Sequence, residues 1–134
     1  MSKYERRIKE FTVLFAVGGI IYSLVELAWR GRTHPSMGIA GGLCLCGLYK
    51  VRSRTAHWGL AAGAALGCAL ITSVEFIFGC VCNKALKLGV WDYSNRFCNL
   101  LGQICLLYTL LWFLICFPAF GICSVIKKHL FDRW

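Results

Sequence analysis

Two glutamates, Glu26 and Glu75, stand inside long apolar runs and are the acidic side chains most able to do chemistry there. A carboxylate among apolar residues is costly, so it must pair, face a bundle interior or lie near a membrane interface. If the two approach each other, they form a shared cup for a cation or polar substrate and suit proton coupling. The alternative is two structural helix-end carboxylates bridged to Arg30, Arg32, Arg96 or His34.

A second group of candidate residues lies in the connection after Glu75. This connection is dense in aromatic, amide and charged side chains, which are the types that recognise ligands. The plainer interpretation is an aromatic belt at the membrane interface combined with helix caps. The candidate substrate-binding residues are therefore Glu26, Glu75, Arg30, His34, Trp91, Asp92, Tyr93, Ser94, Asn99 and Gln103.

No catalytic or metal-binding motif accompanies these candidates. His34 could titrate or bind a metal, but no second histidine stands nearby. The chain contains no phosphate-binding loop of the Walker type and no Ser/His/Asp pattern. We therefore predict no metal, no cofactor and no ATPase activity in this chain.

Apolar residues dominate the segments that must position the candidates. Hydrophobic residues make up 58% of the 134 residues, only 16% are charged, and the mean hydropathy is +0.64. A soluble protein of this size could not bury so much apolar surface. The runs at 11–29, 36–50, 58–79 and 99–126 predict an all-α integral membrane protein, a bundle of four transmembrane helices in one domain spanning residues 1–134. Segment 36–50 is shorter than the roughly 20 residues of a full crossing, so a re-entrant hairpin is its alternative.

Lysine and arginine counts predict the orientation of the bundle in a cell membrane. With four crossings, ten bases lie on the side of the two termini and five on the other side. Because cytoplasmic loops carry the excess of bases, both termini are expected inside. The net charge of +9 then reflects membrane orientation and contact with anionic lipids rather than nucleic-acid binding.

The sequence also suggests an internal duplication of a two-helix unit. Residues 21–26 resemble 71–75, and residues 41–45 resemble 102–106. The two repeats run from about 11 to 50 and from about 58 to 126, related by an axis along the membrane normal. This pairing favours a full crossing by segment 36–50, because its partner is long enough to be one.

Small residues and cysteines give further expectations. Glycines four residues apart allow helix backbones to approach closely, within one chain or in a homo-oligomer. The spacing predicts such contacts at Gly38, Gly42, Gly59, Gly63 and Gly67. Cys80, Cys82 and Cys98 lie near one connection and could form a disulfide in an oxidising space, although free thiols are the favoured interpretation.

Two stretches of the chain resemble a known family over residues 18 to 115. The matching residues are 22–26, 29–31, 33–34 and 36–38 in the first half, and 91–94, 97, 99–100, 102–106 and 111–112 in the second. Their pattern resembles the CmpB-like group called putative ABC-transporter type IV permeases. Relatives carry Arg at the position of Gln103, which puts a charge-binding role of that position in doubt. The resemblance implies a permease, although the connection 50–57 is short for a helix that would couple to an ATPase.

Three functions compete at this point. The first is a transport or channel subunit, oligomeric or joined to a partner membrane subunit. The second is a scaffold or accessory protein whose basic inner ends bind anionic lipid or a partner. The third is a small membrane enzyme acting on lipid, in which His34, Glu75 and Asp92 would work together at the outer interface.

Overall fold

The computed structural model describes residues 2–31, 34–89, 91, 94–95 and 97–130, with the side chains of Arg30, His129 and Leu130 excepted. These residues form four α-helices: α1 (Lys3–Arg30), α2 (Pro35–Thr55), α3 (Leu60–Gly79) and α4 (Leu106–Leu130). A 3-10 turn, η1 (Ala56–Trp58), joins α2 to α3, and a π-helical segment, η2 (Cys80–Ala85), extends α3. The all-helical fold class is therefore confirmed.

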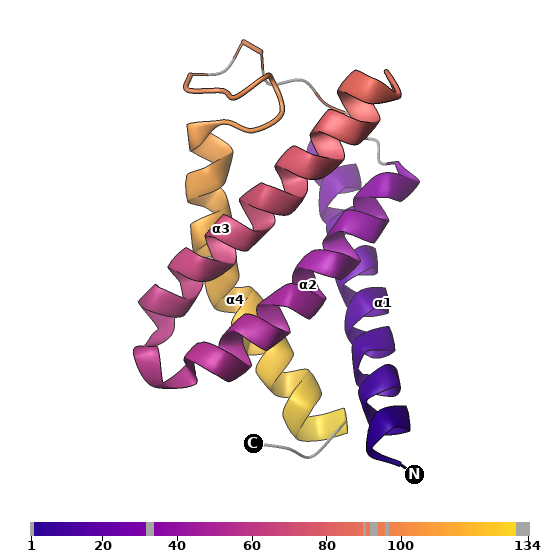
Figure 1. The fold of residues 1–134 in the computed structure, drawn as a ribbon, viewed down its shortest axis with the longest axis vertical. Coiled ribbons are helices and arrows are strands. Elements are labelled where there is room, and N and C mark those ends of the chain that lie inside the picture. The colour runs from indigo at the N-terminus through magenta and orange to yellow at the C-terminus, as the bar shows by residue number, and fades with distance from the viewer. Residues whose placement is uncertain (1, 32–33, 90, 92–93, 96, 131–134) are drawn as a thin grey trace.

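The helices alternate in direction along the bundle. α1 and α3 rise in the view of Figure 1, whereas α2 and α4 descend. The start of α1 and the end of α4 consequently lie together, at what we call the terminal end. The connections from α1 to α2 and from α3 to α4 lie at the opposite end, which we call the loop end.

Among the described residues, three helices are long and apolar enough to cross a membrane: 3–29, 60–85 and 106–128. Their length and composition point to a membrane location. α2 has 21 residues but is not among the three, since glycines dilute its apolar content and Arg52 and Arg54 occupy its last turn. Its full crossing, and with it the four-span topology, stays a prediction. α2 packs against α1, α3 and α4, so protein rather than lipid surrounds much of it.

Local signals in the sequence fix the helix ends. The Ser2 hydroxyl accepts from the backbone N–H of Glu5 at 3.1 Å, and the Glu5 carboxylate accepts from the N–H of Ser2 at 2.9 Å. This reciprocal capping box starts α1. Gly31 ends it in the left-handed conformation, with φ of 73°. α2 begins at Pro35, whose missing N–H costs nothing in a first turn.

Glycines bring α1 and α2 into backbone contact. A Cβ on Gly18 would lie 2.7 Å from the carbonyl oxygen of Gly41, and one on Gly42 would lie 2.8 Å from the ring of Phe15. Gly19 meets the carbonyl of Gly38 in the same way, at 2.9 Å. The sequence predicted close helix packing at Gly38 and Gly42 of α2, but it did not predict that Gly18 and Gly19 of α1 form the other side of the contact.

On α3 the predicted glycines divide into two that pack within the chain and one that does not. Gly63 faces Thr55, and Gly67 faces Leu48 and Cys116, so both are packing positions. A Cβ on Gly59 would meet nothing within 4 Å. Gly59 instead precedes α3 with φ of 92°, a backbone conformation that residues with a Cβ atom rarely adopt.

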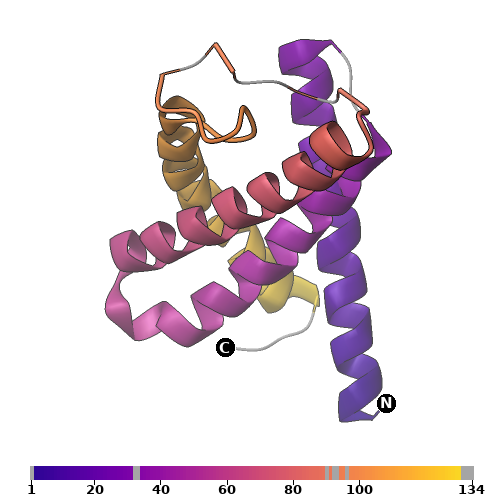
Figure 2. The ribbon, with the colours of Figure 1, turned by 45° about the horizontal axis from the view of Figure 1, so that its top comes forward.

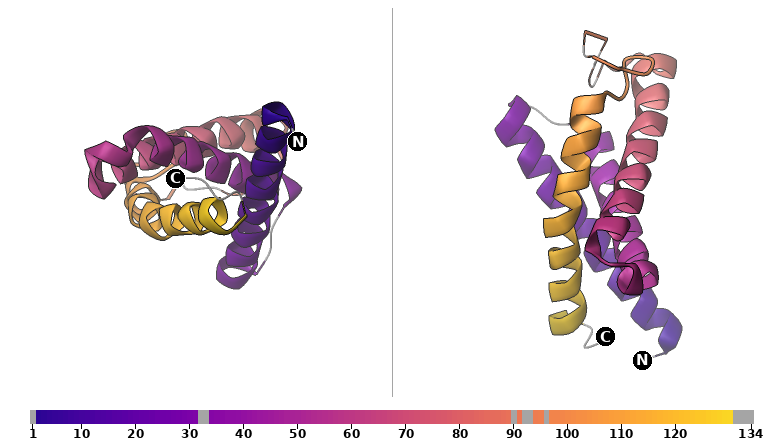
Figure 3. Two further views of the ribbon diagram at one scale, coloured as in Figure 1. Left: turned by 90° about the horizontal axis from the view of Figure 1, so that it is seen from below. Right: turned by 90° about the vertical axis from the view of Figure 1, so that its left-hand side faces the viewer.

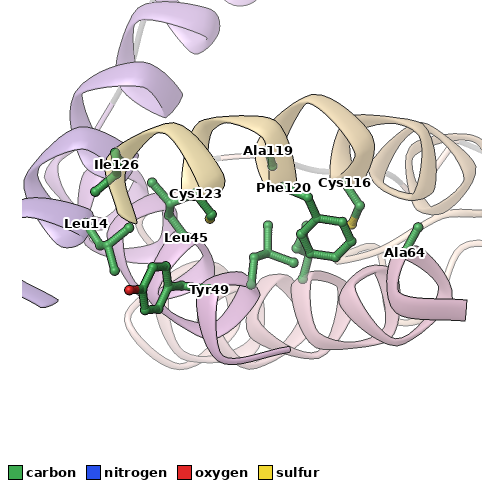
Figure 4. Packing of buried hydrophobic residues seen from close by; sticks show 11 residues of the cluster. Leu14, Leu45, Tyr49, Ala64, Cys116, Ala119, Phe120, Cys123 and Ile126 are labelled. Atoms are coloured by element: carbon green, nitrogen blue, oxygen red, sulfur yellow. The ribbon is translucent and has the colours of Figure 1, made fainter. Parts of the chain in front are cut away.

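A core of aliphatic, aromatic and thiol side chains fills the space between α2, α3 and α4, with Leu14 of α1 closing one side (Figure 4). Phe120 is 1% exposed, and Cys116 and Cys123 are fully buried. All nine cysteines are free thiols, including Cys80, Cys82 and Cys98. Buried thiols here act as small apolar side chains.

The two stretches that suggested an internal duplication do not have the same local structure throughout. Residues 41–45 lie inside α2, whereas Gly102 forms a turn with φ of 73° before α4 begins at Leu106. α1 also crosses α2 obliquely, and its loop-end half projects away from α4 (Figures 2 and 3). The duplication stays a prediction.

Candidate functional site

Glu75 is a buried acid that three helices enclose. It lies one turn before the end of α3 and is 8% exposed. The indole Nε1 of Trp112, on α4, donates a hydrogen bond to Oε2 of Glu75 at 2.7 Å. The Trp112 ring stacks on the Tyr22 ring of α1, with centroids 5.8 Å apart and planes at 27°. A carboxylate in an apolar segment is thus held by protein groups, as the cost of burying it requires.

Polar atoms continue along the face of α3 that carries Glu75. Cys68 lies two turns before it, and its thiol donates to the Thr109 carbonyl of α4 at 3.1 Å. Thr72 lies one turn before Glu75, and its hydroxyl oxygen is buried without a hydrogen-bond partner among the described residues. A polar strip therefore runs between α3 and α4 beside the carboxylate.

The described residues of the connection from α3 to α4 form a hydrogen-bonded cap over the loop end, which we call the lid (83–89, 91, 94–95 and 97–105). Asn83 Nδ2 donates to Oε1 of Gln103 at 2.8 Å, and the Trp91 indole donates to the Gln103 carbonyl at 2.9 Å. The backbone N–H of Trp91 donates in turn to Oδ1 of Asn83 at 3.3 Å. Trp91 and Gln103 are 5% and 4% exposed. Their described hydrogen bonds hold the lid together.

The lid contacts the Glu75 site through aromatic and apolar side chains. Trp91 packs with Met37 and Cys82, and Tyr22 packs against this cluster while it stacks on Trp112. Gly79 allows the Gln103 side chain of the lid to lie directly against the backbone of α3. A Cβ at Gly79 would be 2.6 Å from Oε1 of Gln103. A change in the lid can therefore reach Glu75 through Tyr22.

Other predicted site residues have more local roles. The ring nitrogen Nδ1 of His34 accepts from the backbone N–H of Ser36 at 3.2 Å and caps α2. Asn99 Nδ2 donates to the Ser94 carbonyl at 3.1 Å, and Asn99 Oδ1 accepts from the N–H of Gly102 at 3.1 Å. Both contacts shape the lid.

The remaining predicted residues are less well defined. Glu26 is half-buried near the loop end of α1, one turn beyond Tyr22. The side chain of Arg30, and all of Asp92 and Tyr93, lie outside the described residues. The enzymatic hypothesis needs Asp92 beside Glu75 and stays an untested alternative.

Sequence reasoning missed a second buried acid among the described residues. Glu10 is 3% exposed on α1, and the Tyr49 hydroxyl of α2 donates a hydrogen bond to its carboxylate. Lys127 of α4 lies over the Tyr49 ring, 5.4 Å from its centroid. Glu10 precedes the apolar run predicted at 11–29, but α1 extends back to Lys3 and therefore includes it.

A shallow groove lies elsewhere, between α1 and α2 toward the loop end. Its volume is about 420 Å³, and Glu75 is not among its lining residues. Its lining combines small residues with larger apolar ones. The small residues are Ala16, Gly19, Ser23 and Gly38, and the others are Phe15, Ile20, Leu24, Pro35 and Ile39. The groove is thus separate from the carboxylate site.

Comparison with protein families matches residues 26–133 to the family described as "Putative ABC-transporter type IV". The match covers the lid, Glu75 and Trp112, and it confirms the resemblance seen in the sequence. No curated protein and no solved structure matches the chain.

Proposed function

Because the chain belongs to the putative ABC-transporter type IV family, we propose that it is a multi-pass transport subunit of the cell membrane. In this proposal the loop end faces outward, and Glu75 is the polar group that receives a proton or another cation on its way through the bundle. Four short helices enclose little space alone, so a second copy or a partner membrane subunit completes the pathway.

The observation that carries the proposal is the buried Glu75 carboxylate inside an apolar helix. It is held by one indole N–H from another helix and has the Thr72 hydroxyl on the same face of α3. Intramembrane carboxylates of this kind typically serve ion or proton pathways. The lid covers the site from the loop end, so motion of the lid would admit or exclude water.

A flux measurement tests the proposal with protons as the probe. The full chain is reconstituted into vesicles that contain a pH-sensitive dye, and a potassium gradient with valinomycin supplies the driving force. We expect faster acidification than in empty vesicles, and a return to the empty-vesicle rate in Glu75→Gln. Equal rates for the native chain and the Glu26→Gln/Glu75→Gln double variant would remove a transport role for these acids.

Chemical labelling tests the same carboxylate without requiring a partner subunit. Dicyclohexylcarbodiimide reacts with protonated carboxyl groups in apolar surroundings, and mass spectrometry locates the adduct. We expect labelling of Glu75 that increases as the buffer is acidified. The matched control is Glu5, which is exposed at the start of α1 and should stay unlabelled. Failure to label Glu75 at any pH would contradict its exchange of protons.

A membrane accessory protein is the second candidate function, and the groove between α1 and α2 favours it. Small residues in its lining would let a helix of a partner membrane subunit approach closely. In that case Ala16→Ile would reduce recovery of the complex after crosslinking in membranes, while Glu75→Gln would leave it unchanged.

A further inference from the structure

The terminal end of the bundle carries a large surplus of basic side chains. They come from α1, α2 and α4, and we call them the basic collar: Lys3, Arg6, Arg7, Lys9, Lys50, Arg52, Arg54, Lys127 and Lys128. Two acids share this end among the described residues, and both are engaged within the protein. Glu5 caps α1 together with Ser2, and Glu10 is buried against Tyr49. The collar therefore keeps a surplus of positive charge, and Lys50 and Arg54 are among its exposed members.

We propose that the basic collar is a binding surface for anionic phospholipids, with the headgroup phosphate held by Lys50 and Arg54. These two residues are one helical turn apart on α2, so their side chains share a face, and both are exposed. Lys50 is also positioned, because its ammonium group lies 5.6 Å from the centroid of the Phe11 ring of α1. Arginine supplies two parallel N–H donors to a phosphate, and lysine adds a point charge.

Aromatic residues place the collar at the height of lipid headgroups. Tyr4 is 75% exposed on α1, and Trp58 is 58% exposed in the turn that follows Arg54. Tyrosine and tryptophan concentrate where hydrocarbon meets headgroups, because one part of each ring is apolar and another is polar. The exposed bases and these two rings thus share the terminal end of the bundle, as a contact with lipid headgroups requires.

The combination of exposed bases and exposed aromatic rings at one end of the bundle favours an anionic lipid over a protein partner. The negative leaflet of a cell membrane faces the cytoplasm. The cytoplasmic location of the collar rests on the orientation in the proposed function, but its affinity for anionic headgroups does not.

Native mass spectrometry of the full-length protein in detergent tests the assignment. Phosphatidylglycerol and phosphatidylcholine with identical acyl chains are titrated in turn. The native chain should bind phosphatidylglycerol more tightly, and Lys50→Gln/Arg54→Gln should weaken that binding by about 25-fold, since each base near an anionic surface contributes about fivefold. Phosphatidylcholine binding should not change.

A matched control removes two bases at the other end of the bundle. Lys84 and Lys87 are also exposed, so Lys84→Gln/Lys87→Gln makes the same change in net charge. It should alter phosphatidylglycerol binding by less than about twofold. Lys50→Arg/Arg54→Lys preserves both charges but not the paired donors of Arg54, so it should lose less binding than Lys50→Gln/Arg54→Gln. Helix content by circular dichroism confirms that each variant is folded.

Three outcomes would overturn the proposal. One is equal binding of the two lipids by the native chain. Another is an equal loss in the collar and control variants, which would indicate a general effect of charge. The third is displacement of the lipid by inorganic phosphate but not by chloride at the same ionic strength, which would assign the site to a soluble phosphate. Because no transport is measured, none of these results depends on the flux experiment.

Discussion

The indole of Trp112 donates a hydrogen bond to the Glu75 carboxylate, so the two residues should act as a unit. Glu75 could be recognised in the sequence because an acid in an apolar run is conspicuous. Trp112 could not, because its partner lies 37 residues away and only helix packing brings them together. Glu10 was not recognised for another reason, because in the sequence it follows Lys9 and precedes the apolar run. It lies inside the bundle only because α1 begins as early as Lys3.

Removing the indole donor tests this unit. Trp112→Phe keeps an aromatic ring beside Tyr22 but leaves the carboxylate without that donor, so we expect a loss of about 1–2 kcal/mol in the free energy of unfolding. The measurement is denaturation by dodecyl sulfate in mixed micelles. Glu75→Gln combined with Trp112→Phe should cost less than the sum of the two single changes. Strict additivity would show that the hydrogen bond contributes no coupling.

Backbone contact between α1 and α2 is the main feature at the scale of elements. The glycine spacing in the sequence indicated close packing of α2, and its partner is the Gly18–Gly19 pair of α1. The spacing could not identify that partner, because small residues permit an approach without specifying which helix makes it. For the same reason Gly59 fits the four-residue spacing, although its role is to start α3 with a positive φ.

Adding a single methyl group at Gly41 should force α1 and α2 apart. A Cβ on Gly41 would lie 2.5 Å from Cβ of Tyr22 and 2.9 Å from the carbonyl oxygen of Gly18, and neither helix can yield without repacking. We expect Gly41→Ala to lower the free energy of unfolding by about 1–3 kcal/mol. The same micelle denaturation measures it.

Gly121 supplies the control for this change. It lies on α4, and a Cβ there would meet nothing within 4 Å. Gly121→Ala should be neutral or should stabilise the protein by up to about 1 kcal/mol, because alanine loses less backbone entropy in a helix. If Gly41→Ala behaved in the same way, the close contact between α1 and α2 would be wrong.

For the whole molecule, the number of crossings determines where the two ends of the chain lie. The apolar runs sufficed to predict helices in a membrane, and three of the spans meet the criteria of length and composition. The oblique path of α1 could not be predicted, because residues that face lipid and residues that face protein are both apolar. The structure of the lid could not be predicted either. Its hydrogen bonds join Asn83, Trp91 and Gln103, which are far apart in an irregular segment with no repeating sequence pattern.

Epitope tags distinguish four crossings from three. With α2 across the membrane, tags at both ends of the chain are accessible only after the cell membrane is permeabilised. A tag inserted at residues 86–89, in the exposed part of the lid, is accessible in intact cells. If α2 does not cross, the termini lie on opposite faces, and one terminal tag becomes accessible without permeabilisation.

The place of α2 among its three neighbours has a consequence for biosynthesis. A glycine-rich helix that ends in two arginines partitions poorly into lipid by itself, so it should leave the insertion machinery only when α1 is beside it. The nascent chain would then enter the bilayer as a hairpin, with the Gly18–Gly41 contact formed before α3 is synthesised. Damage to that contact would be seen first as rapid degradation of newly made protein in the cell.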